Sequence, residues 1–294
     1  MEEIVYLNGS FVPRSQAWIS VFDYGFLYGY GLFETMRAYH AKIFLLERHL
    51  KRLLDSADVI GLKSGLVDID LGKACVETLR ANGLQDARLR LTVSGGERGS
   101  FPGISNRTPL TVLVTATSYS VMPSQVYDKD FKAVVSSFRR YSQSPLSGVK
   151  SANYLINLLA KREAEETGMD EVLLLNEQSF ITEGSISNVF LAAHSGLVTP
   201  PVTSGILPGI TRGVVMELAE TLKIRVVEDN VRLEDLKHFE EAFLTNSVME
   251  VMPLVGVRDD AGKITPIGSG KPGKITTRLM SAYREMVERE TAPR

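Results

Sequence analysis

The sequence predicts an α/β protein built as two domains, each mixing strands and helices. Three observations lead to this fold class. Strand-like and helix-like segments alternate, the 294 residues are enough for two medium-sized cores, and a polar, turn-rich stretch separates a smaller first part from a larger second part. We therefore expect an N-terminal α/β domain over 1–117, an interdomain linker over 118–127 and a C-terminal domain over 128–294.

The first domain is expected to begin with a β-hairpin and to contain two helices. Residues 3–7 and 11–13 flank Asn8-Gly9, a favoured two-residue turn. The clearest amphipathic helix runs over 46–60, where leucines recur on one face at helical spacing. The remaining expected elements are a helix over 68–82 and strands over 32–39, 42–45, 87–94 and 109–117.

The second domain mixes strands and helices in an order that indicates a barrel-like core without determining its topology. Its expected strands cover 131–138, 171–176, 188–192, 196–199, 224–228 and 240–245. Its expected helices cover 151–166, 210–222, 233–238 and 272–290.

Composition and charge exclude several classes of function. Hydrophobic residues make up 44% and charged residues 23% of the chain, which is typical of globular proteins. The formal net charge of -2 leaves no basic surplus for nucleic acid, and no apolar run is long enough to span a membrane. The single cysteine, Cys75, and an acidic N-terminus without signal-peptide features favour a cytoplasmic location. The four histidines lack ligand spacing, so no metal site is expected.

The most informative stretch runs from Glu183 to Arg212. It opens with a polar turn at Glu183, continues through two short strands, and ends in a Pro- and Gly-rich loop before a long amphipathic helix. A glycine at a helix N-terminus, here Gly209, leaves backbone N–H groups suited to a phosphate. Alternatively, Gly209-Ile210-Thr211 is an ordinary capped helix start. The whole stretch offers a carboxylate and a phosphate cup.

This stretch closely resembles the signature of the class-IV aminotransferases, pyridoxal-phosphate (PLP) enzymes of fold type IV. The matching residues are Glu183, Asn188-Val189-Phe190, Thr199 and Gly209-Ile210-Thr211-Arg212. The resemblance covers nearly the whole chain. It implies a smaller N-terminal α/β domain, a larger C-terminal domain with a barrel-like sheet, PLP bound between them, and a homodimer whose interface completes the site.

The resemblance also implies which residues hold PLP. Lys150 is expected to form the Schiff base, because it precedes an apolar helix where an amine can be desolvated and so become nucleophilic. Glu183 is expected to face the pyridine nitrogen, and Arg52 to bind the phosphate through its fork of donors. Tyr154 is expected either to hydrogen-bond the ring hydroxyl or to pack. Further phosphate contacts are expected at Ile210, Thr211, Ser247 and Val248.

The substrate pocket is expected to be lined by one strand and one loop of the first domain. The strand side chains are Phe33, Thr35 and Arg37, preceded by Tyr28. Arg98, in a glycine-rich loop, either binds a substrate carboxylate, as an arginine in a comparable loop does in some relatives, or is a solvated loop cation.

Two activities remain open within this family. The loop from Thr199 to Arg212 looks very like that of transaminases, which move an amino group between an amino acid and a 2-oxo acid. Thr35 and the stretch from Asp23 resemble 4-amino-4-deoxychorismate lyases, which release pyruvate and 4-aminobenzoate. Phe33-Glu34-Thr35 departs from the Phe-Glu-Gly of branched-chain enzymes, and D-amino-acid enzymes are the other aminotransferase choice. Transamination, the commoner chemistry, is placed first. A PLP-free scaffold is disfavoured, because Lys150, Glu183 and Arg52 are all present.

Overall fold

The computed structural model describes residues 2–97, 109–120, 127, 130–259 and 261–292. The chain forms two compact units. The first contains residues 1–121, 149–154 and 287–294, and the second contains residues 122–148 and 155–286. The predicted linker over 118–127 lies mostly outside the described residues. Within the described ranges, no helix combines the length and the apolarity needed to cross a bilayer.

The first unit is built on a six-stranded sheet in the order β2-β1-β6-β5-β3-β4. The β1–β2 hairpin turns at Asn8-Gly9, where both residues have positive φ. The strands that make this sheet are β1 (Ile4–Leu7), β2 (Ser10–Pro13), β3 (Gly31–Tyr39), β4 (Lys42–Ile43), β5 (Ala87–Ser94) and β6 (Thr111–Ser118).

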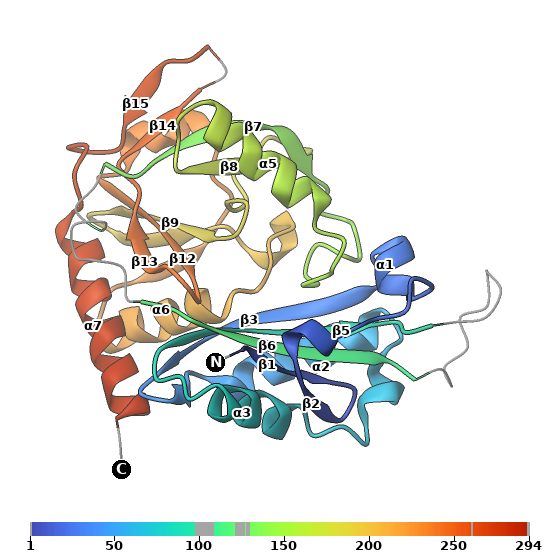
Figure 1. Ribbon diagram of the computed structural model, residues 1–294. Coiled ribbons are helices and arrows are strands. Elements are labelled where there is room, and N and C mark those ends of the chain that lie inside the picture. Colours follow the sequence, from blue (N-terminus) through green and yellow to red (C-terminus); the bar gives the residue numbers. More distant parts are fainter. Residues whose placement is uncertain (1, 98–108, 121–126, 128–129, 260, 293–294) are drawn as a thin grey trace. The chain divides into compact units, whose positions relative to one another are not determined.

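Helices α2 (Leu46–Val59) and α3 (Leu71–Ala81) cover one face of this sheet (Figure 1). The predicted helix over 68–82 begins at Leu71 because the Asp70 side chain accepts the Lys73 N–H and caps the helix. Alternate residues of β3, among them Leu32 and Met36, pack against the helices in one apolar core. Short 3₁₀ helices cover Arg14–Gln16 and Lys63–Leu66.

One helix of the first unit was missing from the sequence-based expectation. Helix α1 (Tyr24–Tyr28) lies just before β3 and is capped by the Asp23 carboxylate, which accepts the Gly25 N–H at 2.7 Å. Five residues are too few to produce a helical hydrophobic period, so the sequence pattern gives no sign of this helix.

The second unit contains two sheets that enclose a common apolar core. The five-stranded sheet has the order β11-β10-β9-β12-β13, and the four-stranded sheet has the order β15-β14-β7-β8. Its strands are β7 (Lys132–Arg140), β8 (Glu171–Asn176), β9 (Asn188–Ala193), β10 (Gly196–Thr199), β11 (Val226–Glu228), β12 (Glu241–Asn246), β13 (Glu250–Pro253), β14 (Gly256–Arg258) and β15 (Ile264–Pro266).

Helix α5 (Leu155–Glu166) packs against β7 and β8, and helix α6 (Ile210–Thr221) packs against β12 (Figure 1). Helix α7 (Lys274–Thr291) closes the chain, and 3₁₀ helices cover Val202–Ser204 and Leu233–His238. The predicted helix over 151–166 begins only at Leu155, because the residues before it pair with a strand of the first unit. That pairing positions Lys150.

Candidate active site

Lys150 lies on a short extended segment that adds to the edge of β3. The Phe33 N–H donates to the Lys150 carbonyl at 3.0 Å, and the Ala152 N–H donates to the Gly31 carbonyl at 2.8 Å. A β-bridge joins Leu32 to Ser151 between these two bonds. The backbone of Lys150 is therefore held by the sheet of the first unit.

The Lys150 side chain is half-buried and faces aromatic rings of the same unit. Its Nζ lies 4.6 Å from the centroid of the Phe33 ring and 5.7 Å from that of Tyr154. The two rings meet edge to face, with centroids 5.2 Å apart. Arg90, which sequence reasoning missed, places its Cζ 3.9 Å from the Phe33 centroid. Burial, followed by the charge of Arg88, lowers the pKa of Arg90.

The predicted pocket residues of β3 share the face opposite the helices. Thr35 stands beside Arg90 in the β3–β5 register. Arg37 is buried, and its Cζ lies 4.4 Å from the Tyr39 centroid and 4.8 Å from the Tyr119 centroid. In the sequence, the one sign that Arg90 belongs to this face is that Arg88 and Arg90 stand two residues apart in the strand predicted over 87–94, so that both point to the same side of the sheet. Phe33 therefore lies between the Lys150 amine and the Arg90 guanidinium, and Arg37 stands further along the same face of β3.

Tyr28 and Arg98 are the two remaining predicted substrate residues. Tyr28 ends α1 and is exposed, with its ring edge to face against Tyr24 at 5.0 Å. Arg98 lies outside the described residues.

Arg52, the predicted phosphate ligand, is held in a buried cluster with Glu34 and His49. Its Nε donates to Glu34 Oε1 at 2.8 Å and its Nη2 to Glu34 Oε2 at 2.6 Å. His49 Nδ1 lies 2.7 Å from Glu34 Oε2. Glu34 is fully buried and His49 is nearly so. Sequence reasoning named only Arg52, because Glu34 comes from β3 and nothing in the local pattern of α2 distinguishes His49.

Opposing effects determine the charges in this cluster. Burial would raise the pKa of Glu34, but the charge of Arg52 and hydrogen bonds from His49 and Arg52 lower it to about 2. Burial lowers the pKa of His49, the bond to Glu34 raises it, and the charges of Arg52 and Lys150 lower it further. At neutral pH the cluster is thus an ionised Glu34, a cationic Arg52 and a neutral His49 that donates its Nδ1–H.

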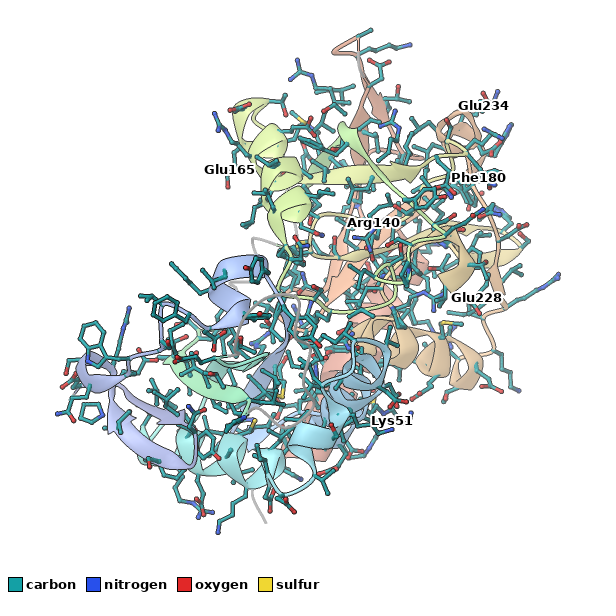
Figure 2. All side chains as sticks on the ribbon, turned by 90° about the vertical axis from the view of Figure 1, so that its right-hand side faces the viewer. Lys51, Arg140, Glu165, Phe180, Glu228 and Glu234 are labelled. Atoms are coloured by element: carbon teal, nitrogen blue, oxygen red, sulfur yellow. The ribbon has the colours of Figure 1, made fainter. Side chains whose placement is uncertain are left out.

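In the second unit, Glu183 is held by donors from three segments. Arg140 Nη2 lies 2.9 Å from Glu183 Oε1. The Leu207 N–H donates to Glu183 Oε2 at 2.9 Å, and Asn188 Nδ2 donates to the same oxygen at 3.2 Å. Arg140 is the last residue of β7. Figure 2 labels it in the second unit, together with Glu165, which is exposed on helix α5 of the same unit. Arg140 is a second residue that sequence reasoning missed.

A second buried carboxylate, that of Glu171, accepts hydrogen bonds from the turn that carries Glu183. Glu171 Oε1 accepts the Ser185 N–H at 3.1 Å, and its Oε2 accepts the Ser187 hydroxyl at 3.1 Å. These bonds hold both serines of the signature turn while Glu183 and Asn188 form a β-bridge at its ends. The conformation of the turn is therefore held by bonds within the protein.

The predicted phosphate cup lies beside the same turn. Gly209 is the N-cap of α6, so Ile210 and Thr211 occupy its first turn, where backbone N–H groups lack partners within the helix. A Cβ at position 209 would overlap Asn188 Oδ1, so this close approach requires glycine. Asn188 Nδ2 also donates to the Leu207 carbonyl at 2.9 Å, which connects the helix start to Glu183.

The β12–β13 hairpin brings a second predicted part of the cup to this region. Its loop contains Ser247 and Val248 and follows Thr245, which pairs with Asn188. Asn246 Oδ1 accepts the Val248 N–H at 2.8 Å and the Met249 N–H at 2.7 Å. The buried Thr245 Oγ1 has no hydrogen-bond partner, so this part of the described site retains an unused polar atom.

The described residues supply, unit by unit, the groups that PLP requires. The first unit offers the Lys150 amine and the Arg52 guanidinium, and the second offers the Glu183 carboxylate and the N-terminus of α6. Among the residues that the structure describes, no group of three His, Cys, Asp or Glu side chains could hold a metal ion.

Acid should destabilise the protein through the Glu34 cluster. The pKa of Glu34 is lower in the folded protein than in the unfolded chain. Its contribution to the free energy of unfolding is therefore complete above pH 4.5 and is lost as the pH falls towards about 2. His49 also has a lowered folded pKa, so the unfolded chain binds a proton more readily below 6.5. Urea unfolding should show stability falling from pH 7.5 to 5.5, with His49 contributing at most about 1.4 kcal/mol per pH unit. The free energy of unfolding of His49→Asn should fall less steeply with pH over this range. A slope identical to that of the wild-type protein would show that His49 is not its origin.

Removing Arg140 should leave Glu183 buried without its counter-charge. We expect Arg140→Met to lower the free energy of unfolding by about 3 kcal/mol, the low end for a buried pair that loses one partner. Arg140→Met combined with Glu183→Gln should recover much of that loss. The measurement is a double-mutant cycle by urea unfolding, and strictly additive costs would argue against a coupled pair.

Comparisons with known proteins identify the family. The model of the amino-transferase class IV family matches residues 31–257. A Methanocaldococcus jannaschii protein, provisionally named a branched-chain-amino-acid aminotransferase, is 36% identical over 285 residues, 96% of each chain. The D-alanine aminotransferase of Bacillus licheniformis is 31% identical over 98% of each chain. The aminodeoxychorismate lyase of Bacillus subtilis is 31% identical over 97% of this chain and 95% of its own.

A solved structure agrees with this assignment across nearly the whole fold. The branched-chain amino acid aminotransferase of Thermobaculum terrenum, solved in its PLP form, superposes with a TM-score of 0.85 at 29% identity. The match covers 97% of this chain and 94% of the other. This confirms the predicted fold type IV architecture, and the chain is an enzyme that belongs to the class IV aminotransferase family.

Proposed function

We propose that the chain is a PLP-dependent aminotransferase that transfers an amino group between an amino acid and a 2-oxo acid. The observation that carries the proposal is the Lys150 amine, held on the edge of β3 against the Phe33 and Tyr154 rings. An amine fixed beside aromatic rings suits nucleophilic attack on a cofactor aldehyde. The names of the relatives favour a branched-chain or D-amino-acid type of aminotransferase.

Each predicted site residue has a task in this proposal. Lys150 would be the residue that holds PLP covalently through its amine, and as a free amine it would carry the proton that the amino group's transfer requires. PLP, when bound, supplies an electron-accepting pyridine ring. Glu183 would keep a proton on the ring nitrogen, Arg52 would bind the phosphate, and Tyr154 would bind the ring hydroxyl or pack. The helix N-terminus and hairpin loop complete the phosphate contacts through Ile210, Thr211, Ser247 and Val248.

The substrate would meet the β3 face of the first unit. Phe33, Thr35 and Arg37 lie on that face, with Arg90 beside Thr35, so both apolar contact and carboxylate binding are available. Tyr28 and Arg98 remain predicted contributors to the same pocket.

A second candidate is 4-amino-4-deoxychorismate lyase activity, releasing pyruvate and 4-aminobenzoate. Thr35 favours it, because a departure from the branched-chain pattern falls at this position, on the same face of β3 as the other predicted substrate residues. The Bacillus subtilis relative is similar to the same degree as the D-alanine enzyme. Both activities would use Lys150 and Glu183, so only a substrate test separates them.

We also propose that the enzyme works in the cytoplasm as a homodimer. In the first unit, the apolar segment 18–28 exposes many large side chains: Trp18, Ile19, Val21, Phe22, Phe26, Leu27 and Tyr28. In the second unit, α5 exposes Leu155, Ile156 and Leu158. Exposed apolar clusters of this kind are typical of protein interfaces.

The dimer predicts a defined effect of charge on the apolar segment 18–28. The wild-type chain should elute with twice the protomer mass of 32.4 kDa in light-scattering chromatography. The measured mass of Phe26→Asp should fall to that of the protomer. The dimer would have to bury an unpaired carboxylate at its interface, and this cost favours dissociation. Val67→Asp, at an exposed valine outside the segment, is the matched control and should leave the mass unchanged. A monomeric wild-type protein would refute the proposal.

Lys150→Ala should lower amino-group transfer by roughly 10²–10⁴-fold or more, because it removes both the covalent anchor and the proton carrier. The reconstituted variant should also lose the visible absorption of lysine-bound PLP. Lys51→Ala is the control, since this exposed lysine on α2, labelled in Figure 2, pairs with Asp55 on the same helix. Unimpaired transfer by the Lys150 variant would overturn the assignment.

The absorption spectrum also decides between the two activities. L-leucine, D-alanine and aminodeoxychorismate would each be added to the purified holoenzyme. Conversion to a stable pyridoxamine spectrum by an amino acid would identify an aminotransferase and its stereochemical preference. An unchanged resting spectrum, with pyruvate and 4-aminobenzoate released from aminodeoxychorismate, would identify the lyase.

A further inference from the structure

Glu34 interrupts an apolar row of β3. The residues on either side of it in this row, Leu32 and Met36, are buried in the core beneath the helices. A carboxylate at such a position loses its hydration, and the fold could fill the row with another aliphatic side chain. The charge therefore has a purpose other than packing.

The ion pair between Glu34 and Arg52 gives little reason to assign that purpose to stability. Buried ion pairs can often be replaced by apolar residues of similar volume without loss of stability. What an apolar residue cannot do is orient a guanidinium. The two parallel bonds from Arg52 to Glu34 fix the plane of the Arg52 fork, and His49 holds the carboxylate from a further direction.

Orientation matters because arginine side chains are otherwise mobile. An unrestrained arginine side chain has many rotamers, and part of this conformational entropy is lost when it binds a ligand. An arginine already held by Glu34 has lost that freedom before the ligand arrives, so binding costs less. The arrangement is suited to a small, rigid anion such as a phosphate ester.

We propose that Glu34 and His49 are positioning residues that hold the Arg52 guanidinium in the orientation that binds the phosphate of PLP. The inference rests on the proposed function, which makes Arg52 a phosphate ligand. It has a consequence that distinguishes orientation from charge. Glu34 is an anion near a proposed phosphate site, so charge alone would make its removal strengthen phosphate binding, whereas loss of orientation would weaken it.

The test compares two cofactor analogues on the full-length chain stripped of PLP. Dissociation constants are measured by absorbance for PLP and for pyridoxal, which has the aldehyde but no phosphate. Glu34→Gln should weaken PLP binding by roughly tenfold, by analogy with the partners that orient metal ligands, whose loss costs at least that much in affinity. Its affinity for pyridoxal should be unchanged, because pyridoxal makes no phosphate contact.

Two variants of His49 refine the assignment. His49→Leu removes the donor to Glu34 and should weaken PLP but not pyridoxal. His49→Asn can place an amide donor where Nδ1 stands, so it should restore PLP binding. Glu34→Asp keeps the charge but shortens the side chain, so it should also weaken PLP binding. It replaces Glu34→Gln in the test if a thermal melt shows that Glu34→Gln does not fold.

Arg52→Ala separates failure of this inference from failure of the proposed function. If Arg52→Ala leaves the preference for PLP over pyridoxal intact, Arg52 is not a phosphate ligand and the proposed function is wrong at this residue. If Arg52→Ala removes the preference while Glu34→Gln leaves it intact or strengthens it, the positioning role is overturned. Equal weakening of PLP and pyridoxal by Glu34→Gln would also overturn it, because that is a purely structural effect.

Discussion

The backbone pairing of residues 150–152 with the edge of β3 is the interaction on which the candidate active site depends. Two hydrogen bonds and a β-bridge attach this segment to the first unit, although the chain on either side of 149–154 belongs to the second unit. A lysine on a strand edge has its backbone fixed by the sheet, so its side chain starts from a defined place. Phe33, which shares one of these bonds, then supplies the ring that faces the Lys150 amine.

In each unit, the cost of burying a carboxylate is offset by hydrogen-bond donors and positive charge around it. Glu34 is surrounded by Arg52 and His49, and Glu183 by Arg140, Asn188 and the Leu207 N–H. Burial raises the free energy of each anion, and charged or N–H donors in fixed positions offset that cost. Each carboxylate is consequently held by several donors at once, which is the property that a cofactor site needs from its polar groups.

Sequence patterns predicted well those elements whose cause is local. The Asn8-Gly9 turn, the amphipathic helix over 46–60 and the strands over 171–176 and 196–199 all agree with the structure. The start of α5 was predicted four residues too early, because residues 151–154 are drawn into contacts with the region of β3, more than a hundred positions away in sequence. Helix α1 was missed because its capping bonds, rather than a hydrophobic period, define it.

The sequence by itself determined the family, the signature turn at Glu183 and the chemistry-bearing residue types such as Lys150, since these depend on local order and spacing. Only the tertiary structure decided which groups meet: Arg52 with Glu34, Arg140 with Glu183, and Arg90 with the Phe33 ring. The reason is that a charge acquires its function from its surroundings. Burial and the nearest opposite charge determine whether a side chain is ionised and where it points, and both come from segments that lie far apart along the chain.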